Sequence, residues 1–139
     1  MSKNVYRRIK KYVEIARALK PGHQTGQYFH VTIVCKKRKV LAIGINDLHK
    51  LNIDHRFGPY TPSRGAAAGS YKSGIHSEVS ALIKLGREDC SDLDFYNIRI
   101  NNLGLPAASK PCHNCQRVLR QVGYKNIYYF DENGNVQRM

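Results

Sequence analysis

Two short stretches decide how this chain folds: residues 76–78 read HSE, and residues 111–115 read PCHNC. Cys112 and Cys115 are three residues apart at the predicted start of a helix, so both thiols should lie on its first turn and face the same way. A helix N-terminus favours negative charge and therefore the thiolate form, which binds metal ions. Pro111 suits this position, because its missing N–H would be unpaired there anyway. The second stretch therefore predicts two metal ligands at one helix end.

His76 opens the preceding predicted helix and is the predicted third ligand. Three protein ligands leave a tetrahedral Zn²⁺ one position for water, as in catalytic zinc sites, whereas structural sites have four protein ligands. Glu78 would then be close enough to move protons as a general acid–base. The alternatives are no metal, or a structural zinc with His113 or Cys90 as fourth ligand. His113 should point away from the cysteine face of the helix, and Cys90 has no motif around it.

Hydrophobic periodicity and turn residues predict a layered α/β domain around these stretches. The expected elements are a helix over 5–19, a β-hairpin over 28–45 with its turn at 36–39, a helix over 75–85, a strand over 95–100, a helix over 112–122 and a strand over 127–130. Residues 131–134 supply turn chemistry for a C-terminal β-hairpin, whereas residues 46–74 and 103–110 should form loops. We expect a single domain over residues 1–139, with a three-layer α-β-α fold and a mixed sheet of about five strands.

The two motifs, each at the start of a predicted helix and separated by a predicted strand, resemble those of the cytidine deaminase superfamily. The order of elements agrees from about Val5 to Phe130, and the expected hairpin is similar to that of the hairpin-ended branch. The resemblance implies a cytidine-deaminase-like fold with Zn²⁺ on His76, Cys112 and Cys115. It also implies hydrolytic deamination of cytosine to uracil, with Glu78 as the catalytic residue that carries the protons.

The resemblance further implies substrate contacts. An asparagine at the end of the second strand usually contacts the sugar in this superfamily, and Asn46 occupies that place, although it could also be a simple turn residue. Free-nucleoside deaminases have a glutamate two residues later, where this chain has Leu48, which argues against a free nucleoside. The other predicted substrate contacts beside the metal motifs are Ser77, Ser109 and Lys110, the last suited to a phosphate.

The predicted loop over residues 46–74 should form one wall of the site. It offers basic side chains for phosphates and aromatic rings for stacking on bases, namely Arg56, Arg64, Lys72, His55, Phe57, Tyr60 and Tyr71. The alternative is a solvated surface loop that its aromatic residues merely anchor. The mixture is suited to a single-stranded nucleic acid.

The charge distribution favours the same substrate. The chain has 23 Lys+Arg and 10 Asp+Glu, a net charge of +13, and residues 1–40 hold eleven basic residues and one acidic residue. A surface of this kind attracts polyphosphate chains, although it could also serve solubility or an acidic protein partner. We therefore expect cytosine in single-stranded DNA or RNA as the substrate. The alternatives are a free nucleoside or nucleotide (cytidine, deoxycytidine or dCMP) and a non-catalytic zinc-containing nucleic-acid-binding module.

The remaining expectations concern location and the other candidate ligands. No apolar run approaches the roughly 18 residues of a membrane span, and residues 1–11 do not resemble a secretion signal, so a cytoplasmic protein without a membrane partner is expected. A homo-oligomer is compatible with the sequence. Cys35 is expected in the core, and the histidines without ligand spacing are expected at the surface or in loops: His23, His30, His49 and His55.

Overall fold

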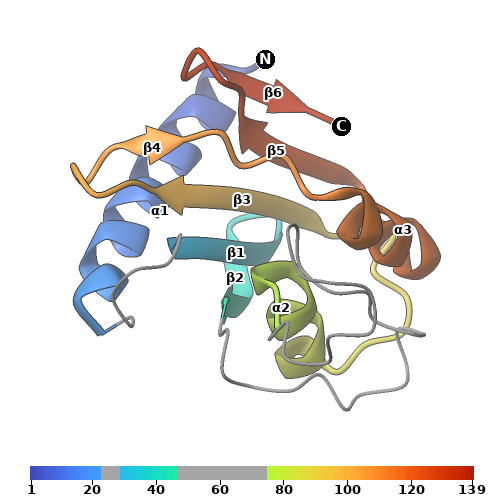
Figure 1. Cartoon of the computed structure of the whole chain (residues 1–139). Coiled ribbons are helices and arrows are strands. Elements are labelled where there is room, and N and C mark those ends of the chain that lie inside the picture. Colours follow the sequence, from blue (N-terminus) through green and yellow to red (C-terminus); the bar gives the residue numbers. More distant parts are fainter. Residues whose placement is uncertain (23–28, 47–74) are drawn as a thin grey trace.

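The structure is a computed structural model that describes residues 1–22, 29–46 and 75–139, and its described part is a sheet with helices on both faces (Figure 1). In chain order the elements are α1 (Lys3–Leu19), a short 3-10 helix η1 (Lys20–Gly22), β1 (Phe29–Lys36), β2 (Lys39–Ile45), α2 (Ser77–Leu85), β3 (Asp94–Ile100), β4 (Pro106–Ala107), α3 (His113–Val122), β5 (Asn126–Phe130) and β6 (Val136–Arg138). The predictions made for residues 47–74, including those for His49 and His55, lie outside the described residues, as does that for His23.

The sheet is mixed and has six strands in the described part of the chain. Its strand order is β2-β1-β3-β5-β6, with β4 paired to β3 beside this path. β1 is antiparallel to both β2 and β3, β3 is parallel to β5, and β5 is antiparallel to β6. The expected mixed sheet and the C-terminal hairpin are therefore confirmed.

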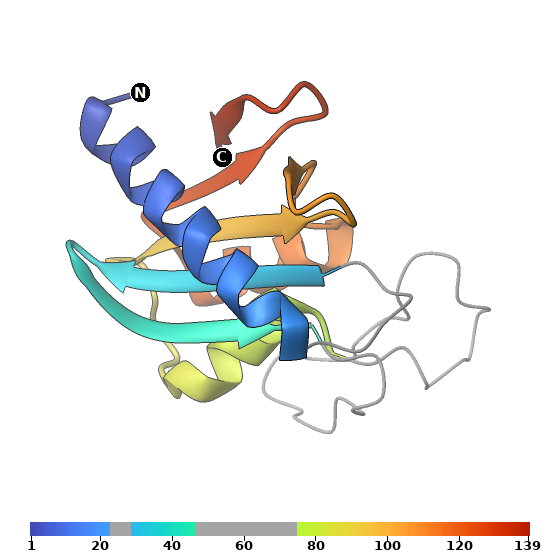
Figure 2. The same ribbon diagram turned by 90° about the vertical axis from the view of Figure 1, so that its left-hand side faces the viewer.

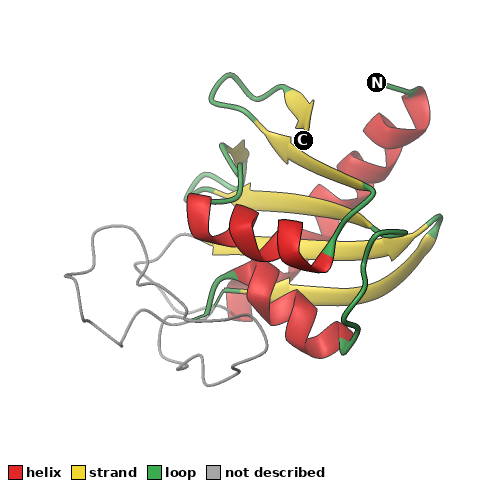
Figure 3. Ribbon diagram, turned by 90° about the vertical axis from the view of Figure 1, so that its right-hand side faces the viewer, coloured by secondary structure: helices red, strands yellow, loops and turns green. Residues whose placement is uncertain are grey.

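Helices cover the two faces of the sheet unequally. α1 lies across one face (Figure 2), and α2 and α3 lie side by side on the other (Figure 3). Because side chains alternate along a strand, β1 gives Val31 and Ile33 to the core under α1, and Val34 to the core under α2 and α3. The three-layer α-β-α arrangement that the sequence predicts is confirmed.

The prediction of a plain loop over residues 103–110 was wrong in one respect. Pro106 and Ala107 form the short strand β4, in which Ala107 pairs with Arg99 and Pro106 with Ile100. Two residues, one of them a proline, are too few to show an alternating pattern. The turn of the first hairpin is also tighter than expected, since β1 extends to Lys36 and β2 starts at Lys39.

A glycine allows α2 to approach the sheet closely. A Cβ atom on Gly44 of β2 would lie 2.2 Å from the carbonyl oxygen of Ser77 and 2.3 Å from the backbone nitrogen of Ala81. Only a residue without a side chain fits there, so the first turns of α2 pack directly on the β2 backbone. This contact determines where the N-terminal end of α2 lies.

Across the residues that the structure describes, none of the helices has both the length and the apolar character needed to cross a membrane.

Candidate metal centre and active site

The two sequence motifs meet at the N-terminal ends of α2 and α3. His76 is the N-cap of α2, in an extended conformation, and Cys112 is the N-cap of α3. Cys112 therefore precedes the first helical turn on which it was expected, and its Sγ accepts a hydrogen bond from the backbone N–H of Cys115 at 3.5 Å. A sulfur in this position replaces the oxygen that usually caps a helix, and it remains directed toward Cys115.

The three predicted ligands lie together. The Nδ1 atom of His76 and the Sγ atoms of Cys112 and Cys115 all lie within 4.8 Å of one another, and this is the one group of three or more potential ligands in the described chain. Nδ1 is 3.3 Å from the sulfur of Cys115 and 3.5 Å from that of Cys112. Ligands on a tetrahedral zinc ion, at about 2.3 Å for sulfur and about 2.0–2.1 Å for nitrogen, lie about 3.6 Å apart. The atoms present thus fit a zinc ion with three protein ligands.

Hydrogen bonds join the three ligand side chains and shift their pKa values. The pKa of Cys112 is lowered to about 4, first of all by its hydrogen bond with Cys115. This effect is larger than the opposite effect of burial, which raises the pKa. The same bond, together with burial, raises the pKa of Cys115 well above its usual value. Burial alone would lower the pKa of His76, but its hydrogen bond to Cys112 and the nearby Glu78 outweigh this and raise it. The opposite directions of the two cysteine pKa values thus arise mainly from the hydrogen bond between them and from burial.

Glu78 is buried beside this cluster, with 6% of its surface exposed. Its Oε1 atom accepts a hydrogen bond of 2.8 Å from the hydroxyl of Ser77. The carboxylate also interacts with Cys115 and His76, whose pKa values both respond to its charge. Glu78 therefore lies beside the metal centre, and its role in moving protons remains a prediction.

The side chains of the predicted substrate contacts Ser77 and Ser109 bind within the protein. Ser77 is 1% exposed, and its hydroxyl lies between Glu78 and Thr32. Ser109 donates from its hydroxyl to the backbone oxygen of Asn97 at 2.8 Å and accepts from the N–H of Phe130 at 2.9 Å. The hydroxyl of Ser109 thus links β3 to β5, and a substrate contact by either serine remains a prediction.

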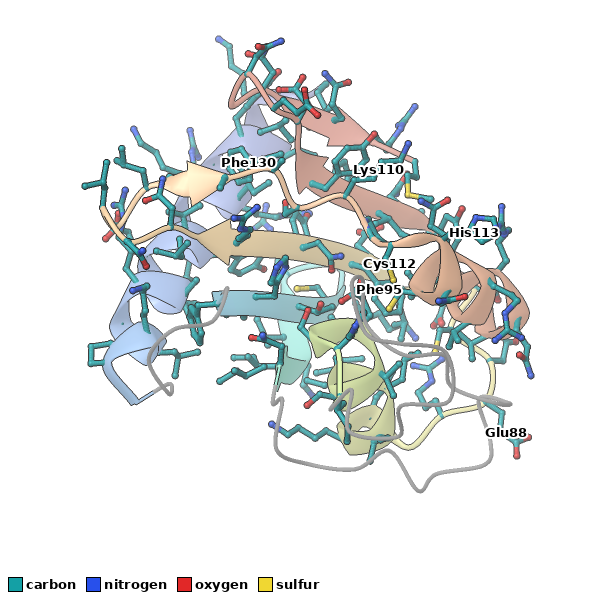
Figure 4. The ribbon with its side chains drawn as sticks, in the orientation of Figure 1. Glu88, Phe95, Lys110, Cys112, His113 and Phe130 are labelled. Carbon is teal, nitrogen blue, oxygen red and sulfur yellow. The ribbon has the colours of Figure 1, made fainter. Side chains whose placement is uncertain are left out.

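Asn46 and Lys110 differ in exposure. Asn46 is 8% exposed, its side-chain oxygen accepts from the backbone N–H of His30 at 2.9 Å, and its own N–H donates to the His30 carbonyl at 3.2 Å. It therefore extends the pairing of β1 and β2 by one residue, and its contact with a sugar remains a prediction. Lys110 is exposed on the segment that leads to Cys112 (Figure 4), which is compatible with the predicted phosphate contact.

His30 lies within β1, in the first strand of the predicted hairpin, and is partly buried, whereas it was expected at the surface or in a loop. By alternation it shares a face with Thr32. Burial lowers its pKa, while the charge of Glu78 acts in the opposite direction. The sequence shows that His30 lies two residues before Thr32 and therefore on the same face of the strand. Which face of the sheet this is can be known only from the register of β1.

The fold and the three-ligand centre with its adjacent glutamate define a zinc-dependent deaminase. A family model described as "Cytidine and deoxycytidylate deaminase zinc-binding region" matches residues 7–131, so the chain belongs to this family and the resemblance is confirmed. The comparison with curated protein sequences found no match.

Solved structures agree with the fold. A cytidine deaminase from Burkholderia pseudomallei is similar with a TM-score of 0.56 and 14% identity, over 100% of this chain and 92% of that one. The dCMP deaminase of cyanophage S-TIM5 in its apo form gives 0.56 and 20%, over 95% of this chain and 86% of that one. Its complex with dCMP and dUMP gives 0.55 and 19%, over 95% and 85%. At these identities the structural likeness supports the fold alone.

Proposed function

We propose that the protein deaminates a free cytosine nucleoside or nucleotide, namely cytidine, deoxycytidine or dCMP, to the corresponding uracil compound. The observation that carries the proposal is the cluster of His76, Cys112 and Cys115 with the buried carboxylate of Glu78 beside it. Among the described residues this centre has three ligands, which favours catalysis over a purely structural role, because structural zinc sites are closed by a fourth protein ligand. The family match gives the reaction type.

The chain's own residues divide the work of the reaction. His76, Cys112 and Cys115 would hold Zn²⁺, which when bound supplies the Lewis acidity that makes water a good nucleophile near neutral pH. Glu78 accepts a proton from the attacking water and delivers it to the ring nitrogen, and then helps the amino group to leave as ammonia. The oxygen of the water becomes the carbonyl oxygen of the uracil ring, so that one water is consumed for each ammonia released.

The basic residues of α1 lie on the face of the sheet away from the metal centre, and this does not favour a polynucleotide substrate. The exposed basic residues Arg7, Lys10 and Lys11 are on α1, which covers the face of the sheet opposite α2 and α3 (Figures 2 and 3). A strand attracted to α1 would therefore lie across the sheet from Glu78. The named enzymes of similar fold are a cytidine deaminase and a dCMP deaminase solved with dCMP and dUMP, which also supports a monomeric substrate. Leu48 lies outside the described part of the chain, and its identity still argues against a free nucleoside among these monomers.

Turnover by the zinc-loaded protein tests the proposal. Cytidine, deoxycytidine, dCMP, and single-stranded DNA and RNA oligonucleotides would be incubated separately, and the change in base mass would be measured. We expect turnover of at least one monomer, and its loss by a factor of about 10²–10⁴ in Glu78→Gln. Glu88→Gln is the matched control, because Glu88 is exposed after the end of α2 and away from Cys112 (Figure 4). Turnover of oligonucleotides alone would overturn the proposal, and zinc binding without any turnover would favour the non-catalytic module.

A further inference from the structure

A chain of buried polar side chains runs from Glu78 into the centre of the sheet. The hydroxyl oxygen of Ser77 lies 2.8 Å from Glu78 Oε1 and 2.8 Å from Thr32 Oγ1. Thr32 Oγ1 lies 2.8 Å from Asn97 Oδ1. All four residues are buried, and Thr32 has no exposed surface. The carboxylate is thus connected to two strands by three short contacts, which we call the Glu78 relay.

The strand register places the relay. Thr32 on β1 is directly opposite Gly44 on β2 and Asn97 on β3, so the three residues form one row across the sheet. Because Gly44 has no side chain, the backbone of α2 at Ser77 comes down onto this row. The Ser77 hydroxyl can therefore reach Thr32 on the next strand. A helix held farther from the sheet would leave the hydroxyl of Thr32 without this partner.

A count of hydrogens shows what the relay can accommodate. Three oxygen–oxygen contacts require three hydrogens, whereas the hydroxyls of Thr32 and Ser77 supply one each. The third can come from Asn97, if its amide presents the NH₂ group to Thr32, so that Thr32 donates to Ser77 and Ser77 donates to Glu78. An asparagine at this end thus allows every contact of the chain to hold a hydrogen.

We propose that Thr32 and Asn97 are positioning residues, which orient the Glu78 carboxylate through Ser77; this inference rests on the proposed function. Buried hydroxyl and amide groups contribute little net stability when paired and are costly when unpaired, so an apolar row would serve the core equally well. The row is polar where it approaches Glu78, as is the pair His30 and Arg99 on one side of it, whereas the pair on the other side, Val34 and Phe95, is apolar. A general acid–base acts only when it is held within reach of the proton that it moves, and the relay holds one carboxylate oxygen in place.

Changes at Thr32 test the proposal in the zinc-loaded protein. Thr32→Val keeps the shape of the side chain and removes the hydroxyl. We expect kcat to fall about 10- to 100-fold, less than the loss of about 10²–10⁴ expected when the acid–base is removed, with KM and zinc content nearly unchanged. Thr32→Ser keeps the hydroxyl that Thr32→Val lacks, and it should retain most of the wild-type kcat. Val34→Ala is the matched control, because Val34 is fully buried on the same strand and face but outside the relay; it should lower stability and leave kcat near that of the wild type.

A double-variant cycle gives a measurement that does not depend on activity. Thr32→Val and Ser77→Ala each remove the contact between these two hydroxyls, so the double variant loses that contact once, whereas the sum of the two single variants counts it twice. The loss of Tm in the double variant should therefore be smaller than the sum of the two single losses. Additive losses would overturn the relay, as would a wild-type kcat in Thr32→Val or an equal fall of kcat in Val34→Ala. If the wild-type protein deaminates no monomer, the proposed function fails, and the cycle alone decides whether the relay exists.

Discussion

Replacing Gly44 by alanine should disturb the active site without touching any residue that performs chemistry. The new Cβ would meet the carbonyl oxygen of Ser77 at 2.2 Å, whereas ordinary van der Waals contact begins at 3.4 Å. If the helix moves as a body, relieving the overlap requires a displacement of α2 by about 1.2 Å (3.4 − 2.2). The obstacle is backbone of α2 rather than a flexible side chain, so no change of rotamer can relieve it.

The displacement would reach the metal centre directly. His76 caps α2 and Glu78 lies on its first turn, so a shift of α2 moves one ligand and the proton carrier relative to Cys112 and Cys115. Overpacking of this kind costs about 1–3 kcal/mol in the free energy of unfolding. A misplacement of about 1 Å can cost about 10²-fold in rate, so we expect kcat to fall by about two orders of magnitude.

Urea unfolding and steady-state kinetics measure the two effects separately. Val40→Ala is the control, because Val40 lies on the same strand and is 37% exposed; it should change neither quantity appreciably. Zinc content should be determined for all the proteins, because a displaced His76 also weakens metal binding. If Gly44→Ala unfolded at the wild-type urea concentration and kept its kcat, α2 would not rest on the β2 backbone as described.

Three further predictions concern the metal and the charged surface. Removing zinc with a chelator should lower Tm, because free zinc at 100 times its Kd adds about 2.7 kcal/mol to the free energy of unfolding; equal melting curves with and without zinc would contradict a site shared by α2 and α3. Cys115→Ala should abolish stoichiometric zinc, whereas His113→Ala should retain it, since His113 is exposed; zinc lost from His113→Ala in metal analysis would identify a fourth ligand. Reversing two charges on α1, as in Lys10→Glu/Lys11→Glu, should leave kcat/KM for the monomeric substrate unchanged at physiological ionic strength, and a clear fall would place these residues near the substrate's path.

The metal motif could be predicted because its geometry is local. Two cysteines three residues apart at a helix start face the same way in whatever fold contains them, and Pro111 marks that start. The main elements could be predicted for a similar reason, since the periodicity of a helix or a strand is contained within the element. β4 was missed because its two residues show no periodicity and exist as a strand only through their pairing with β3.

What could not be predicted depends on contacts between distant segments. Thr32, Asn97 and His30 are ordinary strand residues in the sequence, and only the pairing of β1 with β3 brings them to the same face near Glu78. The amphipathic pattern of α1 shows that one side of the helix is buried, but not which face of the sheet it covers. The positive charge of α1 therefore lies away from the metal centre, because the helix packs on the opposite face of the sheet (Figures 2 and 3).

The Glu78 relay also limits how this sequence can change in evolution. Losing the hydroxyl of Thr32 alone leaves buried groups on Ser77 and Asn97 to be satisfied, and losing Ser77 alone does the same to Thr32. Replacing all three by apolar residues of similar size removes that penalty. In an alignment of related chains, positions 32, 77 and 97 should therefore vary together, as a polar set or as an apolar set. Chains with alanine after the zinc-binding histidine should have an apolar residue at the position of Thr32, and must hold their glutamate by other means.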